Sequence, residues 1–145
     1  MDPDDGHHRV ASEILSQARD RRLAGVKVSS LALHELELNL KAGNILIGGG
    51  RATLEDIAEF FTDLGRLLSL YRLAIFPLTC EGIAKAANLR GEHDLTFYDS
   101  HHAASAMLYD SKIISTDRAY DPIPGLERID PYAISLESTT LPLKG

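Results

Sequence analysis

Residues 95–117, with the sequence LTFYDSHHAASAMLYDSKIISTD, indicate the fold class because they combine a helix, a strand and two well-placed acids. Small and apolar side chains recur at helical spacing between Tyr98 and Tyr109, which predicts a helix over that range. Residues 112–115 are a short, mostly apolar run, which predicts a strand. Asp99 therefore stands at the start of a helix, and Asp117 follows directly after a strand.

The same alternation of helix and strand continues on both sides of this run. The pattern predicts the following further elements: helices at about 8–23, 31–42, 54–68 and 80–89, and strands at 26–29, 73–76 and 126–129. Residues 44–50 are predicted as a loop, because they end in three glycines and lack the Lys-Ser/Thr pair that completes a phosphate-binding loop. Strands that alternate with helices predict an α/β fold, with a mainly parallel central sheet between two helical layers.

Length and composition point to one globular domain spanning residues 1–145. Hydrophobic residues make up 44% of the chain and charged residues 25%, which is ordinary for a globular protein. Residues 131–145 give a weak signal, and one interpretation is a loosely attached tail. No run approaches the roughly 20 apolar residues of a membrane helix. The single cysteine, Cys80, forms no internal disulfide and no thiolate metal cage, so we expect a cytoplasmic protein.

The charge balance limits the classes of partner. The formal net charge of −6 argues against strong, nonspecific binding of nucleic acid, which usually requires a basic surface. It remains compatible with an enzyme that meets RNA locally and holds cations in an acidic pocket.

Three acids fall where an open parallel sheet places its ligand sites, beyond the carboxyl ends of the strands. Glu35 lies one turn into the helix after strand 26–29, Asp99 opens its helix, and Asp117 follows strand 112–115. Each also has a plain structural interpretation. Asp99 complements a helix N-terminus, Glu35 is solvated, and Asp117 belongs to a turn. The six histidines are interpreted as structural or surface residues.

The order of these parts resembles the PIN-domain ribonucleases, and within them the VapC-like toxins of toxin–antitoxin pairs. Three segments carry the resemblance over nearly the whole chain: SSLALHELEL at 29–38, LTFYDSHHAA at 95–104 and IISTDRAY at 113–120. The closing IPGL at 123–126 fits the usual end of the family pattern.

The resemblance implies a metal-dependent endoribonuclease with Mg²⁺ or Mn²⁺ as cofactor. The catalytic and metal-binding acids of the family map to Glu35, Asp99 and Asp117, and carboxylate oxygens are the ligands that these hard cations prefer. Thr116 and Arg118 are the expected contacts to the RNA substrate. The resemblance further implies a homodimer, a possible antitoxin protein as partner, and no membrane association.

The chain departs from the family pattern at its start. The family begins with an apolar strand ending in a first acid, whereas Met1-Asp2-Pro3 stands where that strand has already finished. Asp2, Asp4 and Asp5 look like loop and cap residues. Without that strand, strands 26–29 and 112–115 either pair directly or leave a gap. We weigh three explanations: a true start upstream (which we favour), filling of the gap by residues 132–136 or by another subunit, and a degenerate relative.

Two other functions stay open. The first is a catalytically inactive PIN-like module that binds a protein partner or RNA without cutting, which the absent first acid favours. The second is a nucleotide-binding switch domain, but that class needs a phosphate-binding turn that the sequence does not display.

Overall fold

The computed structural model describes residues 6–137. Asp2, Asp4, Asp5 and the end of the predicted tail, residues 138–145, lie outside the described residues. The elements follow in this order: α1 (Gly6–Arg19), β1 (Lys27–Ser29), α2 (Ser30–Ala42), β2 (Leu46–Ile47), β3 (Gly50–Arg51), α3 (Leu54–Leu70), β4 (Ala74–Phe76), α4 (Cys80–His93), α5 (Phe97–Tyr109), β5 (Lys112–Ile114), the 3₁₀ turn η1 (Arg118–Tyr120), β6 (Glu127–Ile129) and α6 (Pro131–Glu137).

Side-chain caps fix where the helices begin. The Ser29 hydroxyl accepts a hydrogen bond from the Leu31 amide at the start of α2. Thr53 and Asp56 form a reciprocal capping box at the start of α3. Thr79 caps α4 through the Gly82 amide. The caps predicted at Ser29, Thr53 and Thr79 are therefore confirmed, because each satisfies backbone N–H groups that a helix leaves unpaired.

Two local predictions were wrong. Helix α1 ends at Arg19, earlier than the predicted end near residue 23. The segment predicted as a loop contains the hairpin β2–β3, in which Leu46 pairs with Arg51 and Ile47 with Gly50. Gly48 and Gly49 both have positive φ angles, as the two central residues of a tight hairpin turn require. A two-residue turn of this kind needs little hydrophobic pattern on either side, so it gave no strand signal.

The parallel strands form two separate pairs. Strand β1 pairs with β4, and β5 pairs with β6, both in parallel. Among the described residues no strand joins the two pairs, so a gap separates β1 from β5. The α/β prediction is confirmed, and of the two arrangements expected for these strands the structure shows the gap.

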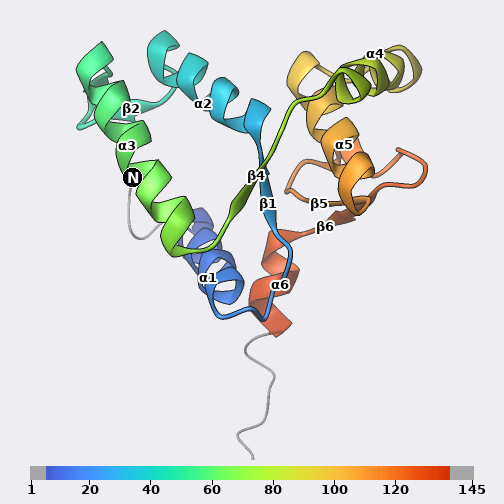
Figure 1. Cartoon of the computed structure of the whole chain (residues 1–145), viewed down its shortest axis with the longest axis horizontal. Helices are drawn as coiled ribbons and strands as arrows, with labels where there is room; N and C mark the ends of the chain where they lie inside the picture. The colour runs from blue at the N-terminus through green and yellow to red at the C-terminus, as the bar shows by residue number, and fades with distance from the viewer. Residues whose placement is uncertain (1–5, 138–145) are drawn as a thin grey trace, which may run out of the picture.

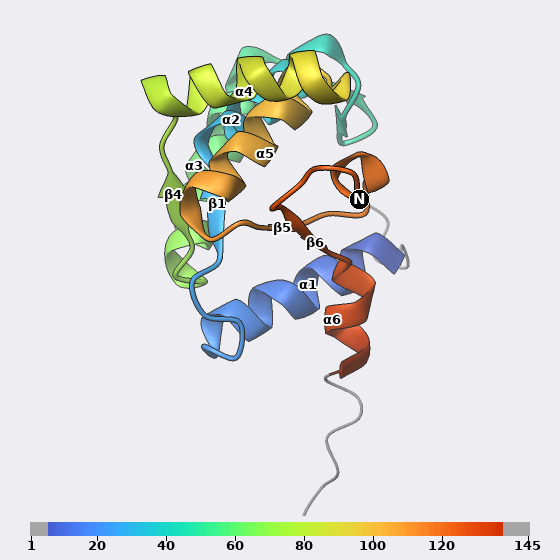
Figure 2. The ribbon, with the colours of Figure 1, turned by 90° about the vertical axis from the view of Figure 1, so that its right-hand side faces the viewer.

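The helices lie around the two strand pairs. In Figure 1, α2 and α3 lie to one side of β1 and β4, and α4 and α5 lie to the other. Figure 2 shows α4 and α5 above β5 and β6, with α1 and α6 together below them. Residues 132–136 belong to α6, so they do not fill the gap as a strand. None of the helices in the described part of the chain is long and apolar enough to cross a membrane.

The best-packed core lies where α4 and α5 meet the loop between β5 and β6. It consists of Ala86, Leu89, Ala103, Ala104, Tyr120, Ile123 and Leu126. Ala103 and Ala104 are fully buried, which confirms that the small side chains of α5 allow close packing. The core fixes α5, and with it the predicted site residue Asp99, against η1.

Candidate active site

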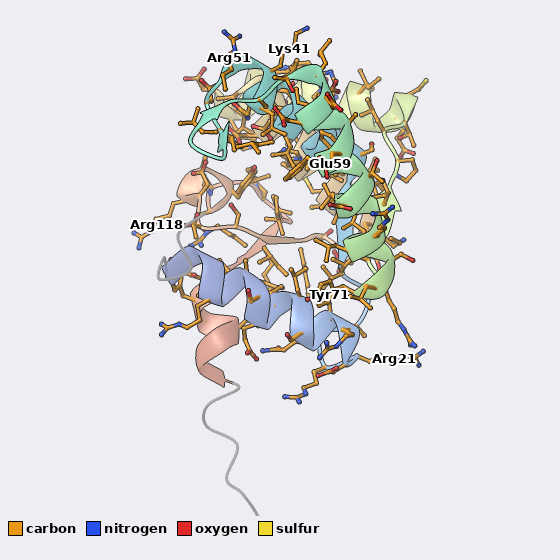
Figure 3. All side chains as sticks on the ribbon, turned by 90° about the vertical axis from the view of Figure 1, so that its left-hand side faces the viewer. Arg21, Lys41, Arg51, Glu59, Tyr71 and Arg118 are labelled. Atoms are coloured by element: carbon orange, nitrogen blue, oxygen red, sulfur yellow. The ribbon has the colours of Figure 1, made fainter. Side chains whose placement is uncertain are left out.

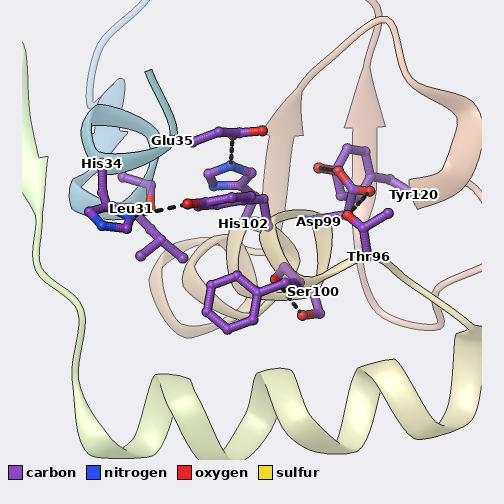
Figure 4. Close-up of polar contacts among 11 residues, drawn as sticks. Leu31, His34, Glu35, Thr96, Asp99, Ser100, His102 and Tyr120 are labelled. Atoms are coloured by element: carbon purple, nitrogen blue, oxygen red, sulfur yellow. Dashed lines mark hydrogen bonds and ion pairs between the residues drawn. The ribbon is translucent and has the colours of Figure 1, made fainter. Parts of the chain in front are cut away.

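Glu35 is held from the neighbouring helix by a histidine. The Nε2 atom of His102 in α5 lies 3.0 Å from Oε2 of Glu35 in α2. The His102 side chain is 16% exposed and that of Glu35 is 38% exposed, so the pair is partly withdrawn from water. Figure 4 shows both side chains directed toward each other across the space between the two helices. Glu35 is thus oriented toward α5, and not solvated on the far side of its helix.

Asp99 is held by two hydroxyl groups. One of its carboxylate oxygens bonds the hydroxyl of Thr96, the N-cap of α5. The other accepts a hydrogen bond from the Tyr120 hydroxyl at 3.2 Å. Both contacts are drawn in Figure 4. Asp99 therefore complements the start of α5, as one sequence interpretation held, and also reaches across to η1.

Asp117 caps the 3₁₀ turn that follows strand β5. Its Oδ1 accepts from the Ala119 amide at 2.9 Å, and its own amide donates to the Ser115 hydroxyl at 3.0 Å. Thr116 and Arg118 are exposed on either side of it. Figure 3 shows the Arg118 side chain directed away from the body of the protein. The turn interpretation of Asp117 is confirmed, and Arg118 is accessible to a large ligand.

Arg128 in β6 ties this loop to the strand before it. Its Nε donates to Oδ1 of Asp121 at 2.6 Å, and its Nη1 donates to the Ser115 carbonyl at 3.0 Å. The Arg128 side chain is 13% exposed, so these charge-assisted bonds lie in a partly dry setting. They lower the pKa of the Asp121 carboxyl and raise that of the guanidinium. The position of Asp117 is therefore set from two sides.

The Tyr120 hydroxyl reports the electrostatics of all three acids. Burial raises the pKa of Tyr120, and the nearby charges of Asp99, Asp117 and Glu35 raise it further. The three predicted acids thus act on one point at the same edge of the molecule. A positive ion at this edge would find a negative potential prepared for it.

The donor set fits a hard divalent cation in kind, since it consists of carboxylate and hydroxyl oxygens. It is not drawn together: over residues 6–137, no three His, Cys, Asp or Glu side chains are grouped closely enough to hold a metal ion. The topology explains the spacing. Glu35 follows β1 and Asp117 follows β5, and these strands belong to the two separate pairs.

The sequence did not reveal the partners of the acids. His102, interpreted as structural or surface, contacts Glu35 from 67 residues away, and Tyr120 contacts Asp99 from 21 residues away. Only one signal was available beforehand. His102 lies three residues after Asp99, so both project from a similar face of one helix.

Comparison with known proteins identifies the family. The search of curated proteins gave no match. A family model described as the PIN domain matches residues 3–126, which include Glu35, Asp99 and Asp117. The match covers most of the chain and agrees with the order of strands, helices and acids in the structure, so the chain belongs to the PIN domain family.

Proposed function

We propose that this protein is a metal-dependent endoribonuclease that hydrolyses RNA phosphodiester bonds at the edge formed by Glu35, Asp99 and Asp117. PIN domains are generally nucleases that act on RNA and use divalent metal ions. The observation that carries the proposal for this chain is the shared action of the three carboxylates on the Tyr120 hydroxyl.

In this proposal Glu35, Asp99 and Asp117 hold Mg²⁺ or Mn²⁺. Such an ion, when bound, polarises a phosphoryl oxygen and lowers the pKa of a water molecule. The protein's own residues supply the orientation. His102 holds Glu35 toward α5, and Tyr120, kept protonated by its raised pKa, donates to Asp99. Each acid is thereby aimed by a neighbour.

Thr116 and Arg118 are proposed to contact the substrate. Both are exposed beside Asp117. A guanidinium group matches the fork of phosphate oxygens, and a threonine hydroxyl donates one hydrogen bond. With a net charge of −6, the protein has to engage RNA through such local contacts and not through a general basic surface.

The biological setting is also part of the proposal. The resemblance in residues 95–104 and 113–120 supports a VapC-like toxin of a toxin–antitoxin pair. On this basis we infer a cytoplasmic homodimer that an antitoxin protein neutralises.

A cleavage assay tests the enzymatic function. The intact chain is incubated with a fluorescently labelled single-stranded RNA in Mn²⁺ or in EDTA. We expect cleavage in Mn²⁺ only, and a fall of at least about tenfold in Asp99→Asn, since loss of even an outer-shell metal partner has that effect. Asp63→Asn is the matched control, because Asp63 is an exposed acid on α3 that bonds Arg66. Equal cleavage by both variants would refute the assignment of Asp99.

One observation favours a second function, an inactive PIN module that binds RNA or a protein without cutting. Within residues 6–137 the possible metal ligands do not form a group of three, and the acids bond their own neighbours. The same assay separates the two functions. RNA retention on the protein without any cleavage in Mn²⁺ would support the binding module.

A further inference from the structure

The gap between the two strand pairs exposes the edges of parallel strands. Within the described residues, β1 has a strand partner only in β4, and β5 has one only in β6. Strand edges carry backbone N–H and C=O groups that can pair with a further strand. Parallel sheets are normally covered on both faces, yet Val28, Ile113 and Ile114 are only partly buried here. The gap thus combines open backbone groups with uncovered apolar side chains.

An open cavity of about 530 Å³ lies in this gap. Residues of both β1 and β5 line it, and one face of α5 contributes His102, Ser105, Ala106 and Tyr109. At about 1.5 Å per residue, the stretch from His102 to Tyr109 spans roughly 10 Å, which is about the length of three extended residues at 3.3 Å each. The cavity therefore matches a short strand in length and in the groups that it offers.

The chain itself offers no suitable strand for this cavity. Its described strands are already paired. Residues 1–5 read MDPDD, and residues 138–145 read STTLPLKG with Pro142 in the middle. Aspartate is rare in strands, and proline removes a ladder hydrogen bond from a central strand. These compositions favour a segment of another polypeptide as the occupant.

The charges around the cavity define the chemistry of that segment. At one end the Lys27 ammonium lies 4.2 Å from the ring centroid of Tyr109, and Lys112 begins the next strand. At the other end His102 contacts Glu35. An acidic residue is therefore favoured beside the lysines and disfavoured beside Glu35.

We infer that the cavity between β1 and β5 binds an extended apolar segment of a partner protein, with an acidic residue at the Lys27 and Lys112 end. The segment adds a strand by pairing with free edges, a recurring mode of peptide recognition. It would also join the two strand pairs and so set the distance between Glu35 and Asp117. The inference concerns binding, and it holds whether or not the protein cleaves RNA.

Hydrogen exchange of the intact chain with a synthetic peptide tests the inference. The probes are capped peptides Asp-Val-Ile-Val-Ile-Gly and the reversed order, with Asp-Val-Pro-Val-Ile-Gly as the control that cannot complete the ladder. At ten times its Kd, one acidic probe is expected to slow exchange within 26–29 and 112–115 by about tenfold, provided that only the bound form is protected. The proline peptide is expected to leave exchange unchanged. Absence of protection by both acidic probes would overturn the inference, and so would protection confined to α3.

Two pairs of variants sharpen the test. Ala106→Phe fills the cavity and is expected to abolish protection, whereas Ala58→Phe on the exposed face of α3 is not. Lys112→Glu is expected to shift the preference to a probe with Lys in place of Asp, and Lys41→Glu is not. This reversal remains measurable even if Ala106→Phe fails to fold. Protection that grows with protein concentration in the absence of peptide would mean that a second copy occupies the cavity, and would also overturn the assignment.

Discussion

His102 and Glu35 join two helices that are far apart in the chain. The imidazole Nε2 lies 3.0 Å from the carboxylate Oε2, and the two residues are separated by 67 positions. The contact fixes the side chain of Glu35 on α2 relative to α5, which also carries Asp99. Two of the three proposed metal ligands are therefore placed relative to each other through a residue that is not itself one of the proposed ligands.

His102 is expected to act as a positioning residue for Glu35. Loss of the imidazole in His102→Leu leaves the carboxylate free to rotate, so we expect the half-saturating Mn²⁺ concentration for RNA cleavage to rise about tenfold. The rate at saturating Mn²⁺ should change much less. His102→Gln, which retains an N–H donor, should recover most of the affinity. His93→Leu at the end of α4 is the control. An unchanged Mn²⁺ dependence in His102→Leu would show that the contact is not needed for positioning.

Tyr120 is expected to stay protonated well into the alkaline range. Burial and then the charges of the acids, Asp99 first, raise its pKa, whereas an unfolded tyrosine ionises near its ordinary pKa of about 10. Above pH 10 the unfolded state therefore loses this proton first, and the free energy of unfolding falls as pH rises. Ultraviolet titration in EDTA should show one of the five tyrosines ionising only at unfolding. Tyr120→Phe should remove that late step. Ionisation of every tyrosine near pH 10 in the folded protein would contradict the prediction.

Local signals in the sequence predicted much of the fold. Ser29, Thr53 and Thr79 cap their helices through bonds to residues two or three positions away, so the sequence alone identifies them. The hairpin β2–β3 was missed because its two-residue strands are too short for an alternating pattern to show. The gap between β1 and β5 depends on long-range pairing, and strand patterns leave pairing partners undetermined.

The site was predictable in its residue types and not in its contacts. The resemblance selected Glu35, Asp99 and Asp117, and the structure places all three near Tyr120. The partners of the acids come from distant segments, and a histidine or tyrosine has no sequence pattern that marks it as such a partner. The separation of the acids follows from the gap between the strand pairs, which only the tertiary structure reveals.

His101 is expected to remain neutral at pH values where an ordinary histidine is charged. Its side chain is 3% exposed, and its Nδ1 has no hydrogen-bond partner among the described residues. Burial lowers its pKa most, followed by the charges of Arg90 and His102. As pH falls through about 6.5, the unfolded chain takes up this proton first, so the free energy of unfolding decreases.

Nuclear magnetic resonance of the imidazole rings in EDTA tests this prediction. The midpoint for His101 should lie below that of an ordinary histidine. Arg90→Gln should raise the midpoint without restoring the ordinary value, because burial is the larger cause. Lys85→Gln on the same helix should leave it unchanged. A normal midpoint for His101 in the unmodified protein would refute the account.

The capping box of α3 is expected to contribute measurably to stability. The Thr53 hydroxyl accepts from the Asp56 amide at 3.2 Å, and the Asp56 carboxylate accepts from the Thr53 amide at 2.8 Å. Thr53→Ala should lower the free energy of unfolding by about 1 kcal/mol, the usual cost of losing an N-cap hydroxyl. Thr53→Ser should cost little, because serine offers the same acceptor. Urea unfolding followed by circular dichroism measures both.

A second readout ties that loss to the box itself and to no other property of the helix. The Thr53 hydroxyl, and then its amide, lower the pKa of Asp56, so the stabilisation is present above the ordinary pKa and lost as pH falls through the lowered one. In Thr53→Ala the pKa of Asp56 should therefore move up toward its ordinary value. Thr62→Ala on the same helix removes a hydroxyl that bonds only the Ala58 carbonyl, and it should change neither quantity appreciably. Equal destabilisation by the two alanine variants would show that the box is not the cause, because alanine itself favours the helix interior.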